Sequence, residues 1–252
     1  MPVFSDQSGR WEEGAIDQMI DELRYLGESE SILVSRNMGG TQDSSVTVKA
    51  GSPIYLITSE RKLPQDELNR LKANLERLID DPDCSKFIEK LNSNLPDSNT
   101  VQIQGRELVS KKFDGGLIEN FDRTRKQYGF WIGSTVNEAY SAVTNLRGIT
   151  FNETKYNRGG LHPWPGGFHL TLVELSGQQS NTLTLIHELL HMHYLPPVGQ
   201  KGVLSVDHNA MAIAAQKSLV DSGIVKSPIQ ITGSSAYYFQ DALVLACGKV
   251  RL

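Results

Sequence analysis

The residues most able to do chemistry lie between positions 184 and 193, where the chain reads Thr-Leu-Ile-His-Glu-Leu-Leu-His-Met-His. His187 and His191 are four positions apart, so on an α-helix they point the same way, separated by about 40°. Two imidazoles placed in this way can bind one metal ion. Glu188 follows the first histidine, where its carboxylate can reach a water on the metal rather than the metal itself. The spacing predicts a zinc site with a glutamate as general base.

The surroundings of this motif favour the metal interpretation, because the segment is otherwise apolar. Its apolar members are Leu183, Leu185, Ile186, Leu189, Leu190 and Met192. A charged group on a mostly buried helix is costly unless it is paired or bound to a metal. The alternative is a chance match whose histidines only cap or pack the helix.

A zinc ion held by two histidines needs at least one more protein ligand, and three residues downstream are candidates. His193 lies about 200° around the helix from His191, so we expect it beside the ligands or at the surface and not on the metal. Asp207 follows a loop and opens another apolar helix, either as the third ligand or as a cap of free backbone amides. His208 is its rival, and the residues alone leave both open.

His-Glu-x-x-His, then a loop, then an aspartate that begins the next helix resembles the aspzincin metallopeptidases, the deuterolysin and peptidyl-Lys endopeptidase group. The resemblance covers residues 165–240 and is strongest on the helix that carries His187 and His191, which we call the metal helix. It implies that His187, His191 and Asp207 bind zinc and that Glu188 is the general base.

The chain departs from this family around the aspartate, where it has neither the Gly-Thr before it nor the Tyr-Gly after it. The missing tyrosine leaves the donor to the developing oxyanion open. The run 235–239 resembles the family's terminal helix, and the candidates for the donor are His208, Tyr238, Tyr237 and Tyr194. A gluzincin needs a later glutamate and a metzincin needs a glycine at position 194, and the chain has neither.

We therefore expect a zinc metalloendopeptidase that hydrolyses peptide or protein substrates. Two alternatives stay open: a zinc hydrolase of non-peptide amides, and a non-catalytic zinc-bound module of a toxin-like or binding kind. A net charge of −4 argues against a nucleic-acid partner. No apolar run is long enough to span a bilayer, and no signal peptide is visible, so the sequence as written indicates the cytosol, or a secreted mature form or excised domain.

The predicted fold class is α+β and zincin-like, with a small mixed sheet packed on the metal helix and further N-terminal helices and strands. We expect an N-terminal extension over 1–95 and a metallopeptidase domain over 96–252. The expected helices are 11–26, 64–80, 84–91, 135–146, one from 181 to about 193 and one opening at 207; the expected strands are 31–35, 46–58, 101–103, 107–110, 149–153 and 168–175.

Two loops and one strand have expected roles. The segment 92–100 is rich in Asn, Ser, Pro and Asp and reads as a linker or long loop. The segment 156–167, with His162 and Trp164, is expected to be a loop at the rim of a cleft. The strand 168–175 is a candidate edge strand for an extended peptide, or an ordinary core strand. Cys84 and Cys247 either form one disulfide or are reduced core residues.

Overall fold

The computed structural model describes residues 32–35, 54–103, 106–135, 141–145, 148–157, 161–164, 173–195, 206, 208–231 and 234–252. The strands are β1 (Ile32–Ser35), β2 (Ile54–Lys62), β3 (Ser98–Ile103), β4 (Arg106–Lys111), β5 (Phe130–Thr135), β6 (Ala142–Asn145), β7 (Gly148–Asn152), β8 (Leu161–Trp164) and β9 (Val173–Ser176). The helices are α2 (Gln65–Ile79), α3 (Pro82–Asn94), α4 (Leu117–Gln127), α5 (Glu153–Tyr156), α6 (Gly177–His191), α7 (His208–Asp221) and α8 (Ser235–Cys247).

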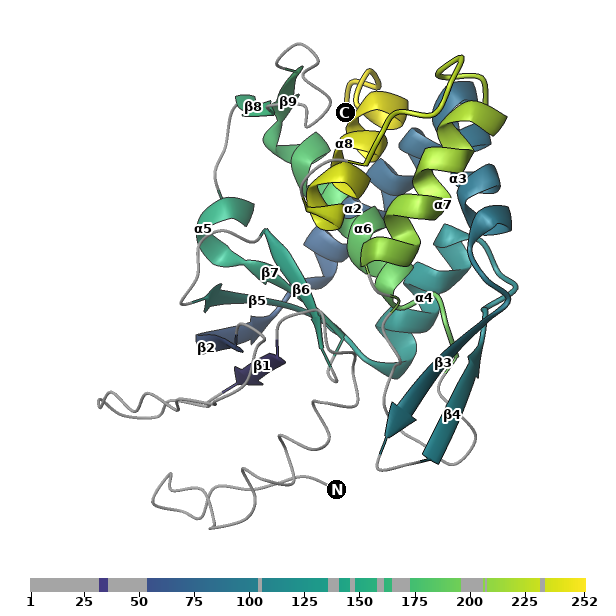
Figure 1. Ribbon diagram of the computed structural model, residues 1–252. Helices are drawn as coiled ribbons and strands as arrows, with labels where there is room; N and C mark the ends of the chain where they lie inside the picture. The colour runs from purple at the N-terminus through teal and green to yellow at the C-terminus, as the bar shows by residue number, and fades with distance from the viewer. Residues whose placement is uncertain are drawn as a thin grey trace, which may run out of the picture.

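The five-stranded sheet lies beside a bundle of the longer helices α2, α3, α4, α6, α7 and α8, which confirms the α+β prediction at the level of class (Figure 1). The largest sheet has the order β1-β2-β5-β7-β6. It is mixed, as expected: β1/β2 and β5/β7 are parallel, whereas β2/β5 and β6/β7 are antiparallel. The hairpins β3–β4 and β8–β9 form two smaller sheets.

Helix α6 carries the His-Glu-x-x-His motif and packs against α2, α4 and α8 in the bundle of Figure 1, and His208 of α7 contacts it. It begins at Gly177, four residues before the expected start. A capping box explains the difference: the Ser176 hydroxyl accepts from the Gln179 amide, and the Gln179 side chain accepts from the Ser176 amide. From Thr182 to His191 every side chain is buried, so the polar groups of the motif lie inside the protein.

Helices α2 and α3 form because their sequences carry clear start signals and apolar stripes. Pro64 precedes α2, and the predicted stripe of Leu68, Leu71, Leu75 and Leu78 is buried, which confirms this helix. Asp81 caps α3 by accepting from two backbone amides. Both helices contribute to the same hydrophobic core as α6, α7 and α8.

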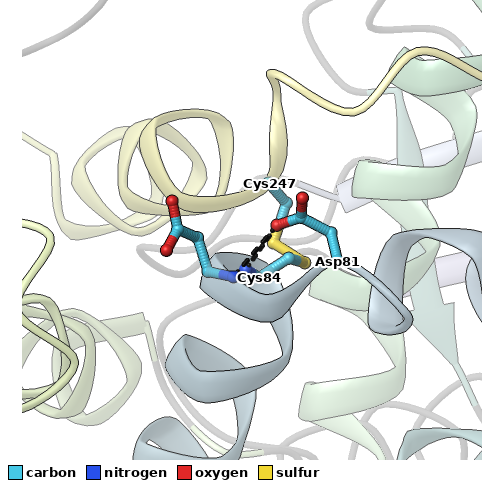
Figure 2. Close-up of a disulfide and its surroundings, with 4 residues drawn as sticks. Asp81, Cys84 and Cys247 are labelled. Carbon is cyan, nitrogen blue, oxygen red and sulfur yellow. Dashed lines mark hydrogen bonds between the residues drawn. A yellow bond between two sulfur atoms is a disulfide. The ribbon is translucent and has the colours of Figure 1, made fainter.

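A disulfide joins Cys84 on α3 to Cys247 at the end of α8, which decides between the two expected states of the cysteines. Figure 2 shows the bond directly above the first turn of α3, where the Asp81 carboxylate accepts from the Cys84 amide at 3.0 Å. Both sulfur-bearing residues are fully buried. The bond therefore ties α8, the last described helix, to α3, the second described helix, from within the core.

Three sequence-based expectations are wrong in the described residues. The helix expected over 135–146 is the strand β6 from Ala142, paired antiparallel with β7. The two-residue connection at 146–147 ends at Gly148, whose φ of 123° and close approach to the Gly129 backbone require glycine. Pairing across this hairpin outweighs the helical spacing of the local apolar residues.

The loop expected over 92–100 is mostly regular structure, because α3 continues to Asn94 and β3 begins at Ser98. Buried Leu91 and Leu95 extend the apolar face of this region beyond the expected end of the helix. Residues 161–164 of the expected loop 156–167 form β8, paired with β9.

The expected strands over 101–103, 107–110 and 149–153 are confirmed by β3, β4 and β7. Residues 173–175 of the expected strand 168–175 belong to β9, and 168–172 lie outside the described residues. The helix expected over 11–26 and residues 46–53 of an expected strand also lie outside them. Among the helices that the structure describes, none is long and apolar enough to cross a membrane.

Candidate metal centre

Three histidine side chains converge at the inner face of α6. The Nε2 atom of His187 lies 3.2 Å from that of His191 and 2.6 Å from that of His208. The His191 and His208 Nε2 atoms are 2.9 Å apart. Two of these residues come from adjacent turns of α6, and the third comes from the first residue of α7. The three atoms form a compact triangle of possible ligands to one ion.

Hydrogen bonds from the Nδ1 atoms of His187 and His191 decide which nitrogen of each ring carries the proton. The His191 Nδ1 donates to the backbone carbonyl of Val206 at 2.7 Å, and the His187 Nδ1 donates to Gln240 Oε1 at 2.9 Å. Since both acceptors are oxygens, the protons of the neutral rings lie on Nδ1 and the Nε2 lone pairs point into the triangle. Lone pairs this close repel one another unless a cation lies between them, so the arrangement fits a metal ion.

Burial keeps the three rings uncharged, which is the state that binds metal. It lowers the pKa of His187 to about 3, an effect that nearby His191 increases and the Gln240 hydrogen bond opposes. Burial also lowers the pKa of His191 to about 4 and that of His208 to about 3. No proton therefore competes with a metal for these nitrogens at neutral pH.

Glu188 is the one acidic residue of the motif and is buried between the two histidines on α6. At 3.6 residues per turn its side chain leaves the helix about 100° from His187 and about 60° from His191. Burial raises the pKa of its carboxyl to about 7, and hydrogen bonds from Thr144 oppose this rise. A buried carboxyl with a pKa near neutrality can both accept and return a proton.

The far end of α6 is held by two polar side chains of α4. The Asn120 amide donates to the Leu189 carbonyl at 2.7 Å, and the Arg123 guanidinium donates to the Met192 carbonyl. Arg123 also lies over the Phe113 ring, with 4.6 Å from its guanidinium carbon to the ring centroid. A cation at a helix C-terminus interacts favourably with the free carbonyls there. These contacts fix the turn of α6 that carries His191.

Of the expected residues, the structure brings together His187, His191 and His208, and Glu188 lies on the same helix as the first two. Asp207, expected to be a metal ligand, lies outside the described residues, so that role stays a prediction. His193 is not in the triangle, as expected, but it is buried and not at the surface: its Nε2 donates to Asn92 Oδ1 at 2.7 Å. Helix α6 ends at His191, which turns His193 away from the metal motif.

The tyrosines considered as oxyanion donors have different surroundings. The Tyr238 hydroxyl donates to the Ile229 carbonyl at 3.0 Å, and the Tyr194 hydroxyl donates to the Pro96 carbonyl. Tyr237 is 64% exposed. The α8 residues that contact His187 are instead Gln240 and Phe239, whose ring lies edge-on to the imidazole with centroids 5.1 Å apart. The donor role of Tyr238 stays a prediction.

Sequence reasoning missed Gln240 and Thr144, which hold His187 and Glu188 respectively. Each is brought to α6 by tertiary packing from a distant segment, so no local motif marks it. Thr144 was also difficult to predict because the sequence of its strand favours a helix. The capping box at Ser176, in contrast, is a signal in the sequence that would have placed the start of α6 correctly.

Imidazole nitrogens suit zinc, copper, iron and nickel alike, so the donor set fits a transition metal without naming it. Comparisons with protein-family models, with curated proteins and with solved structures find no match to this chain. His187, His191 and His208 form a cluster able to hold a metal ion.

Proposed function

We propose that this protein is a zinc-dependent peptidase. The observation that carries the proposal is the triangle of His187, His191 and His208 Nε2 atoms with a buried glutamate on the same helix turn. Three neutral nitrogen ligands leave a fourth position of a tetrahedral zinc ion for water or substrate. The likeness of the motif to the aspzincin metallopeptidases supports zinc over the other metals and a peptide bond over other amides.

His187, His191 and His208 hold the ion in this proposal, and Gln240 and the Val206 carbonyl hold the first two rings in place. When bound, zinc acidifies water and polarises a substrate carbonyl. Glu188 takes the proton of the attacking water at its carboxylate and delivers it to the leaving amine. The buried position of Glu188 on α6 keeps this carboxylate out of bulk water.

Zinc content and hydrolysis of a peptide library test the proposal when measured on wild type and on Glu188→Gln. We expect wild type to hold one zinc and to cleave peptides until a chelator is added. The Glu188→Gln variant keeps its ligands, so it should retain zinc and lose at least about 100-fold in kcat. Absence of chelator-sensitive cleavage in wild type would overturn the peptidase assignment. Equal activity of the variant would overturn the role of Glu188.

A further inference from the structure

Thr144 contacts Glu188 from the sheet. Its hydroxyl oxygen lies 2.7 Å from Glu188 Oε2 and 3.3 Å from the Glu188 backbone carbonyl. Thr144 belongs to β6, which packs against α6, and its neighbour Val143 on this strand pairs with Thr150 of β7. The hydroxyl is therefore carried by a strand whose position is set by pairing, and not by a free loop.

The geometry favours the carboxylate as the partner of this hydroxyl. A threonine hydroxyl has one proton, so it cannot give a full hydrogen bond to both oxygens. The Glu188 carbonyl already accepts from the Met192 amide at 3.2 Å, as expected in the last turn of α6. The carboxylate contact is also the shorter of the two. In the part of the chain that the structure describes, Thr144 is the one side chain hydrogen-bonded to the Glu188 carboxylate.

We propose that Thr144 is a positioning residue for Glu188, holding one carboxylate oxygen so that the other is presented for proton transfer. The inference rests on the proposed peptidase function. A glutamate has three side-chain torsions, and a base must lie within hydrogen-bond distance of the proton that it takes. Hydrogen bonds from the hydroxyl and the backbone amide of Thr144, on a paired strand, remove most of the unproductive orientations before substrate arrives.

A purely structural role is the competing explanation, in which the contact only ties β6 to α6. The two roles predict different effects when the hydroxyl is removed, one on turnover and the other on stability. A positioning residue affects turnover through the hydroxyl and leaves metal binding intact, because Gln240 and the Val206 carbonyl, and not Thr144, hold the His187 and His191 rings. A structural contact affects stability, and its loss resembles the loss of any buried hydroxyl on these strands.

Four single variants separate these roles. Thr144→Val removes the hydroxyl at nearly constant volume, and Thr144→Ser retains it. Thr150→Val is the matched control, since Thr150 is a buried threonine on the adjacent strand. Glu188→Met removes the carboxylate for a thermodynamic cycle with Thr144→Val.

We expect Thr144→Val to lower kcat roughly 10- to 100-fold with KM within about twofold and zinc content unchanged. Thr144→Ser should restore kcat to within about threefold of wild type, and Thr150→Val should leave kcat unchanged. Full kcat in Thr144→Val, no recovery in Thr144→Ser, or an equal loss in Thr150→Val would each overturn the proposal.

A second readout does not depend on hydrolysis. In the metal-free protein, Thr144→Val should lower the urea midpoint in the wild-type background and change it much less in the Glu188→Met background. Additive effects would show that the hydroxyl does not engage the carboxylate, and the proposal would fall. If wild type cleaves no peptide, the peptidase function falls by itself. A non-additive cycle would then still identify Thr144 as the group that holds the Glu188 side chain.

Discussion

The two sides of α6 supply opposite kinds of hydrogen-bond partner to its functional groups. On one side, which we call the helical side, Gln240 of α8 and the Val206 carbonyl place oxygen acceptors behind His187 and His191. The sheet side, formed by β6, places a hydroxyl donor against Glu188. The acceptors keep a proton on Nδ1 of each ring and leave Nε2 free to bind metal. The hydroxyl donor of Thr144 instead holds the Glu188 carboxylate. One buried helix can therefore present both metal ligands and a base, because separate neighbours supply the matching hydrogen-bond partner to each.

Burial also acts on the two sides with opposite signs. It favours the neutral form of every group, so the histidine pKa values fall to about 3–4 while the Glu188 pKa rises to about 7. A metal-free protein therefore contains uncharged rings that are ready to bind metal at neutral pH.

Acid should destabilise the metal-free protein, and this is the largest effect that we expect. His187, His191, His193 and His208 all have pKa values lowered by burial to about 3–4. Between about pH 6.5 and pH 4 the unfolded chain protonates these rings while the folded protein does not, so their contribution is present above pH 6.5 and lost as pH falls. All four histidines act in the same direction over this range, so their losses of stability add.

The effect of Glu188 on the pH dependence of stability has the opposite sign. Because its pKa is raised in the folded protein, Glu188 stabilises the fold at low pH, and this stabilisation is lost as pH rises toward 7. One carboxyl opposes four histidines, so urea unfolding should occur at a lower urea concentration at pH 5 than at pH 7. The Glu188→Gln variant should steepen the dependence, and His208→Gln should make it shallower. An equal urea midpoint at both pH values would contradict burial of uncharged rings.

Removing the third ligand is the next largest change, and it decides between two neighbouring residues. His208→Ala should weaken zinc affinity by at least roughly 100-fold, since one corner of the nitrogen triangle is lost. Asp207→Ala should leave zinc affinity within about threefold if the ligand set is three histidines. Competition with a chromogenic chelator measures both. The reverse result would return the third position to Asp207, as the aspzincin resemblance implies.

The smallest effect concerns Gln240, the helical counterpart of Thr144. Gln240→Leu removes the acceptor of His187 Nδ1 and should weaken zinc affinity roughly 10-fold, with kcat retained when zinc is saturating. Gln240→Glu keeps an acceptor and should bind zinc at least as well as wild type. The contrast between the two sides fails if Gln240→Leu lowers kcat in saturating zinc while affinity is unchanged.

The sequence predicts the chemistry of α6 because that information is local. The four-residue spacing of His187 and His191 and the apolar residues around them depend only on the helix that they form. The leucine stripe of α2 is predictable for the same reason. His208 was also within reach as a candidate, since it stands at the head of the next helix, although the residues could not separate it from Asp207.

The partners of these residues could not be predicted, because they arise from pairing and packing across long separations. Thr144 reaches Glu188 only because Ala142–Asn145 pairs with β7, which local spacing misreads as part of a helix. Gln240 reaches His187 from 53 residues away. Spacing patterns contain no information on such contacts. The glycine at position 148 does indicate the turn between β6 and β7, which brings Thr144 to Glu188.

The bond between Cys84 and Cys247 has a practical consequence for handling the protein. Its two cysteines are 163 positions apart, so every residue of the histidine triangle, together with Thr144, Glu188 and Gln240, lies within the covalent ring that it closes. A ring of this size restricts the unfolded chain by about 5 kcal/mol in the loop-entropy treatment. Thiol reductants attack such a bond, and their thiolates also bind zinc. Loss of activity in a dithiol therefore has two separate causes, and a phosphine reductant without thiols is the reagent that isolates the contribution of the ring.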